Sequence, residues 1–124
     1  MGFFGNLIEG VGLAKHKAAV DAFLKRVVGL DLPTAQLDDF APLIAAGYRA
    51  ESSIEDIGLR IATAFYAKAC MGTARDRAVA DRLYLKLNFV IRTSAALGAI
   101  AIADAEEFET VVRDYTQQRL LRDD

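Results

Sequence analysis

The chain has few of the residues that most often carry chemistry or covalent cross-links. Its 124 residues include one cysteine, one histidine, two prolines and no tryptophan. Because Cys70 has no second cysteine to pair with, no disulfide can close within the chain, and stability must come from a hydrophobic core. With 53% hydrophobic residues, a chain of this length can bury about two thirds of its unfolded surface in a single domain.

The chain also lacks an excess of charge of one sign. Fifteen basic residues face 17 acidic ones, for a net charge of -2. This balance argues against a protein that coats DNA or RNA, because no overall positive field attracts phosphates. The start lacks the basic residues and continuous apolar run of a secretory signal, and the uncharged stretch 93–103 is too short to span a bilayer. We therefore expect a soluble, cytoplasmic protein that binds no nucleic acid.

Helix-forming composition and periodicity dominate what is present. Alanine, the best helix former, is the commonest residue. We predict an all-α fold, a compact antiparallel bundle of about five helices in residues 13–124. The expected helices lie near residues 13–29, 34–46, 53–71, 74–97 and 104–121. Residues 99–103 alternate with a period of two, but a strand there would have no partner, so we expect helix or loop.

Start and stop signals set these boundaries. Ser52, followed three residues later by Glu55, predicts a capping box at the start of the third helix. Gly72 predicts the end of that helix, and Thr73 with Asp76 predicts the start of the fourth. Gly47 is expected to end the second helix.

The apolar faces predict the core. The third helix is apolar on most of its surface, so we expect it to be central, with Asp56 and Arg60 paired on an exposed face. On the first helix the predicted core stripe is Val20, Phe23, Leu24 and Val27. On the fourth helix it is Ala80, Leu83, Leu87, Val90 and Ser94.

The first twelve residues form an apolar, glycine-rich arm. Its large apolar residues are Phe3, Phe4, Leu7, Ile8 and Val11. Each interior glycine destabilises a helix by about 1 kcal/mol relative to alanine, so we expect that this stretch forms no stable helix by itself. Five apolar side chains are too many for a solvated tail. The arm is expected to dock on a partner protein or a second subunit, to lie on a membrane surface, or to fold back onto its own bundle.

Five polar residues are candidates for binding a ligand. Arg75 and Arg77 flank the start of the fourth helix, where free amides and the helix dipole favour anions. Asn88, Arg92 and Tyr66 would fix a small molecule if they met in one cavity. The alternative for all five is structural, as solvated charges or as donors to loop carbonyls.

Catalytic and metal-binding patterns are nearly absent. His16 lies between Lys15 and Lys17, a setting typical of an exposed residue that binds no metal, and no motif for a cofactor is present. We therefore expect a non-catalytic protein-interaction module that binds a partner protein or a second copy of itself. A symmetric homodimer would account for the mean hydropathy of +0.20. The alternatives are a small-molecule or anion-binding protein, or an enzyme, with a site between the third and fourth helices, and peripheral membrane association through the arm.

Overall fold

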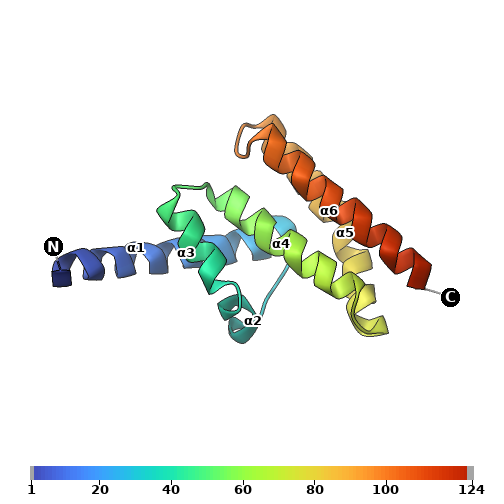
Figure 1. Ribbon diagram of the computed structural model, residues 1–124, viewed down its shortest axis with the longest axis horizontal. Coiled ribbons are helices and arrows are strands. Elements are labelled where there is room, and N and C mark those ends of the chain that lie inside the picture. The colour runs from blue at the N-terminus through green and yellow to red at the C-terminus, as the bar shows by residue number, and fades with distance from the viewer. Residues whose placement is uncertain (1, 123–124) are drawn as a thin grey trace.

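The computed structural model describes the backbone of residues 2–122 and the side chains of residues 10–122 (Figure 1). Within this part of the chain all regular structure is helical, which confirms the all-α prediction. There are six α-helices rather than the expected five, and a π-helical turn. They are α1 (Gly2–Phe23), η1 (Leu24–Val28), α2 (Thr34–Asp38), α3 (Ala41–Arg49), α4 (Ile54–Cys70), α5 (Ala74–Ala96) and α6 (Ile102–Arg122).

Helices α4, α5 and α6 form an antiparallel three-helix unit, and α1 runs across it (Figure 1). Short turns at residues 71–73 and 97–101 connect the three. Helix α4 packs against α1, η1, α3, α5 and α6, which confirms that it is central. The predicted core stripe of α5 is buried along its whole length, at Ala80, Leu83, Leu87, Val90 and Ser94.

The crossing of α1 and α4 depends on a glycine of α4, which has no side chain. A Cβ at Gly58 of α4 would lie 2.4 Å from the ring of Phe23, so only glycine lets the two helices approach this closely. A Cβ at Gly47 would likewise lie 2.5 Å from the side chain of Ile57. The prediction that Gly47 ends a helix was therefore wrong, because it lies inside α3 to admit a neighbouring side chain.

The predicted helix over residues 34–46 is broken into α2 and α3. The break lies at Asp39 and Phe40, and Pro42 is the second residue of α3. In a continuous helix the Pro42 ring would clash with the carbonyl of residue 38 and would have no amide to donate to it. The break places Pro42 in the first turn of α3, where neither problem arises.

The first helix begins at Gly2 and not near residue 13, so the arm is the N-terminal half of α1. Its glycines weaken a helix but do not end it here. Because a helix that is already nucleated extends without a further nucleation cost, the packed C-terminal half of α1 supports the extension.

The other end of α1 also departs from the prediction. Leu24–Val28 form a π-helical turn, which holds more residues per turn than an α-helix. The turn moves the buried position from Val27 to Val28, so Val20, Leu24 and Val28 are buried and Val27 is 41% exposed. Gly29, with φ of 80°, ends the turn in the left-handed conformation.

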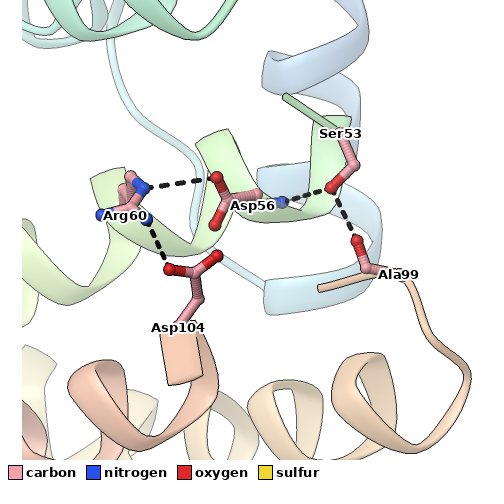
Figure 2. A network of polar contacts seen from close by, with 5 residues as sticks. All are labelled: Ser53, Asp56, Arg60, Ala99 and Asp104. Carbon is pink, nitrogen blue, oxygen red and sulfur yellow. Dashed lines mark hydrogen bonds and ion pairs between the residues drawn. The ribbon is translucent and has the colours of Figure 1, made fainter. Parts of the chain in front are cut away.

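Both caps of α4 differ by one residue from the prediction. Ser53, not Ser52, caps α4: its Oγ accepts from the Asp56 amide at 3.0 Å and donates to the Ala99 carbonyl at 2.7 Å (Figure 2). The hydrogen bond to Ala99 favours Ser53 over Ser52 as the cap, because it ties the start of α4 to the α5–α6 turn. Met71, not Gly72, is the C-cap of α4.

The predicted start of α5 at Thr73 is confirmed, and Thr73 and Asp76 form a capping box there. Thr73 Oγ1 accepts from the Asp76 amide, and the Asp76 carboxylate accepts from the Thr73 amide at 3.0 Å. These hydrogen bonds from Thr73 favour the ionised carboxylate and lower the pKa of Asp76.

Arg60 of α4 links two carboxylates across the fold (Figure 2). Its Nε lies 3.3 Å from Asp56 Oδ2, its Nη2 lies 3.0 Å from Asp104 Oδ1 at the start of α6, and its guanidinium lies 5.1 Å from the ring centroid of Phe108. Burial by itself lowers the pKa of Arg60, but the carboxylates of Asp56, Asp104 and Glu107 outweigh it, and the pKa is raised. The pair with Asp56 is therefore real, but Asp56 is buried and not on an exposed face as expected.

Candidate functional site

Tyr66 is part of the core. Its side chain is fully buried, and its hydroxyl lies 2.6 Å from Thr116 Oγ1 on α6. Because Thr116 donates its own proton to the Val112 carbonyl, Tyr66 must be the donor in this pair. Burial raises the pKa of Tyr66 to about 12. The hydroxyl is thus occupied in joining α4 to α6.

Asn88 and Arg92 line the same groove, but Tyr66 does not. They line a groove of about 530 Å³ between α5 and α6. Asn88 Nδ2 donates to the Tyr84 carbonyl at 2.9 Å, and Arg92 Nη2 lies 3.6 Å from Glu109 Oε2. The predicted meeting of all three residues is not observed, because Tyr66 faces Thr116 in the core while Asn88 and Arg92 flank the surface groove.

Arg75 and Arg77 diverge from one another. Arg77 Nη1 turns back to the Gly72 carbonyl at 3.1 Å, beyond the end of α4. Arg75 lines a groove of about 730 Å³ between α5 and residues 28–33, together with Arg82 and Lys86. Arg82 and Lys86 were not among the predicted binding residues, although their spacing of seven and eleven residues from Arg75 places all three on one face of a helix. We call this the basic groove.

The basic groove contains unpaired cations. Arg75, Arg82 and Lys86 form no ion pair with any side chain that the structure describes. Two carboxylates also line it: Asp76, which is engaged by Thr73, and Asp31, which is 83% exposed and 3.8 Å from Lys25. The groove is therefore positive on its α5 wall.

A second groove, between η1 and α5, is mainly apolar. It has a volume of about 420 Å³, and we call it the apolar groove. Its prominent apolar side chains are Val27, Phe89 and Leu97, which are 41%, 64% and 79% exposed. Phe89 and Leu97 lie outside the buried stripe of α5, so a helical-wheel projection of the sequence would have predicted that they are exposed. The exposure of Val27 could not be found this way, since it follows from the π-helical turn.

The rim of the apolar groove is charged. Arg26, Lys86 and Glu55 line it, and neither Arg26 nor Lys86 forms an ion pair within the part of the chain whose side chains are described. Lys86 also lines the basic groove, so the two grooves adjoin along α5.

The titratable residues outside these grooves are poorly placed for chemistry. Cys70 is buried, and burial raises the pKa of its thiol, which keeps it in the unreactive form. His16 is half-buried, not exposed as predicted, because its ring packs 5.3 Å from that of Tyr48. Among the described side chains of residues 10–122, no three His, Cys, Asp or Glu residues gather in a way that could hold a metal ion.

The predicted interface of the arm is described only at its last residue. Val11 is 51% exposed, whereas Phe3, Phe4, Leu7 and Ile8 lie outside the described side chains. No helix in residues 2–122 has both the length and the apolar character to cross a membrane. The cytoplasmic location stays a prediction.

No protein-family model, curated protein or solved structure matches the chain.

Proposed function

We propose that the protein is an interaction module that binds an amphipathic helix in its apolar groove. The observation that carries this proposal is the exposure of Val27, Phe89 and Leu97 around one concavity. Single exposed apolar side chains are ordinary, but a group of large ones around a groove is typical of a protein-binding surface. Covering each such side chain stabilises a complex by about 2 kcal/mol before the cost of association is subtracted.

The shape and charge of the groove favour a helical ligand. Two helical segments, η1 and α5, form its walls, and a third helix can place side chains spaced three and four residues apart between them. The unpaired Arg26 and Lys86 favour a ligand that carries a carboxylate beside its apolar stripe.

Photo-crosslinking from position 97 tests this proposal. With a photoreactive residue in place of Leu97, we expect crosslinks in cells to one defined protein segment that has an apolar stripe at helical spacing. The matched control is position 121, because Leu121 is 78% exposed and Leu97 is 79% exposed, yet Leu121 lies near the end of α6. Equal crosslinking from both positions, or none from position 97, would contradict the proposal.

The basic groove supports a second candidate function, the binding of a polyanion such as a diphosphate group. The three cations in one row of α5 outnumber the two carboxylates that line the groove, Asp31 and Asp76, and give it a net positive charge. Several anionic oxygens would let one ligand contact more than one of these side chains.

Thermal unfolding with pyrophosphate tests the second candidate. Pyrophosphate at 100 times its Kd should stabilise the fold by about 2.7 kcal/mol, because it binds only the folded state. The double variant Arg75→Gln, Arg82→Gln should lose this stabilisation. In contrast, Arg113→Gln should keep it, since Arg113 lies on α6 outside the groove. An unchanged melting temperature of the wild type across the titration would reject anion binding here.

A further inference from the structure

We infer that the diphosphate group bound in the basic groove carries a hydrocarbon tail, and that this tail lies in an adjoining cavity lined by aromatic side chains. The inference rests on the second candidate function, because it names the class of anion that the basic groove binds. That class is an amphiphile with a diphosphate head group and one apolar tail.

The adjoining cavity lies between α2 and the C-terminal half of α4, and its volume is about 400 Å³. We call it the aromatic cavity, because the half-buried rings of Phe40 and Phe65 line it. Ala64 and Ala69 of α4 also line it, and their small side chains leave the space between the rings open. The volume lies within the range of small-molecule sites, about 300–1,000 Å³, and a partly apolar lining is typical of such sites.

The aromatic cavity and the basic groove are neighbours. They share three lining residues, Gln36, Phe65 and Asp76. The two spaces therefore adjoin beneath residues 28–40, with the aromatic cavity on the α4 side and the basic groove on the α5 side. Figure 1 shows this segment looping out between η1 and α3. One extended molecule can thus occupy both spaces.

Buried side chains hold residues 28–40 in place as a wall. Leu30, Leu32 and Leu37 are buried in the core, and Asp38 of α2 forms an ion pair with Lys17 of α1. These anchors fix the segment at the distance from α4 and α5 that leaves both spaces open.

Charge sets the orientation of the ligand. One cation, Lys68, and two carboxylates, Asp39 and Asp76, line the aromatic cavity. Three cations and two carboxylates line the basic groove. An anionic head group is therefore attracted to the basic groove and repelled from the aromatic cavity, whereas an uncharged tail is free to enter the cavity.

Asp76 lies where the two spaces meet, and its charge is offset there. Hydrogen bonds from Thr73 are the largest cause of its lowered pKa. The charges of Arg75 and Lys68 lower this pKa further, so one cation from each space lies near the carboxylate. A head group can therefore pass close to Asp76 without meeting an isolated negative charge.

The spacing of the arginines fits two linked phosphates. Arg75 and Arg82 lie seven residues, or about 10 Å, apart along α5. Their long side chains can converge on one diphosphate, and each guanidinium can donate two hydrogen bonds to a phosphate. Because Arg75 is next to Asp76, a tail that leaves the head group at Arg75 enters the aromatic cavity past Phe65.

Isothermal titration calorimetry of the full chain, with geranyl diphosphate and with pyrophosphate as probes, tests the inference. Geranyl diphosphate should bind about 100-fold more tightly, which corresponds to the removal of about three to four methylene groups from water. Equal affinities for the two probes would overturn the inference and leave the binding of a polyanion intact. Failure of both probes to bind would overturn the second candidate function as well.

Two tryptophan substitutions locate the tail. Ala64→Trp fills the aromatic cavity from an exposed position of α4, so the fold should be retained. It should raise the Kd of geranyl diphosphate to nearly that of pyrophosphate and leave the Kd of pyrophosphate unchanged. Ala78→Trp is the matched control, because Ala78 is an exposed alanine of α5 that lines neither space, and it should keep the wild-type preference. Circular dichroism would check that both variants melt cooperatively.

The double variant Arg75→Gln, Arg82→Gln locates the head group. It should weaken the binding of both probes, because both are held by their phosphates. Wild-type affinity of this variant for geranyl diphosphate, or wild-type affinity of Ala64→Trp for the same probe, would place the amphiphile elsewhere on the protein and would overturn the inference.

Discussion

Replacement of Tyr66 with alanine is expected to lower the free energy of unfolding by about 4 kcal/mol, and urea denaturation followed by circular dichroism would measure it. Tyr66 is fully buried between α4 and α6, so the substitution removes a large aromatic side chain and leaves a cavity. Thr116 also loses a donor. Tyr66→Phe keeps the ring and should cost only about 1 kcal/mol, which separates packing from the hydrogen bond.

The raised pKa of Tyr66 predicts that the protein loses stability in alkaline solution. Below pH 10 Tyr66 is protonated in the folded and unfolded chains, and its ionisation does not affect stability. Between pH 10 and about 12 the unfolded chain loses the phenol proton while the folded chain keeps it, because the folded pKa is about 12. Stability therefore falls as the pH rises through this window.

Comparison with Tyr66→Phe isolates this contribution from other titrating groups. Across the window wild type should lose about 2 kcal/mol more than Tyr66→Phe, as a two-unit difference in pKa requires. Urea midpoints at pH 9.5 and pH 11.5 would measure it. Parallel losses in the two proteins would show that the Tyr66 hydroxyl titrates normally in the folded chain.

Replacement of Arg60 with alanine is expected to cost about 3 kcal/mol. The substitution leaves Asp56, which is 8% exposed, and Asp104 without their shared cation, and uncompensated charge near the interior is expensive. The contact with the Phe108 ring is lost as well. Urea denaturation at low and high salt would measure the cost, which should change little with salt because the pair is partly shielded from solvent.

A surface ion pair provides the control for Arg60. Arg113 and Asp114 lie 3.6 Å apart on α6, with side chains 66% and 52% exposed. Arg113→Ala should change the free energy of unfolding by less than about 0.5 kcal/mol. A cost for Arg60→Ala as small as this would mean that the network in Figure 2 does not hold α4 to α6.

The helical class and the three central helices follow from local signals in the sequence. Helices α4, α5 and α6 each lie within about two residues of their predicted limits, because their apolar periodicity and the Thr73–Asp76 capping box act locally. The buried stripe of α5 was predicted for the same reason. Pro42 also carried a local signal, which accounts for the break that the prediction of a single helix missed.

Contacts between residues far apart in the sequence depend on how the helices pack. Gly47 looked like a helix end until Ile57 was placed against it, and Ser53 caps α4 because Ala99, 46 residues away, accepts its proton. The apolar groove required η1 to turn Val27 outward beside Phe89 and Leu97. Helix periodicity describes one helix at a time, whereas a groove depends on the packing of two, and that packing is set by side chains distant in sequence.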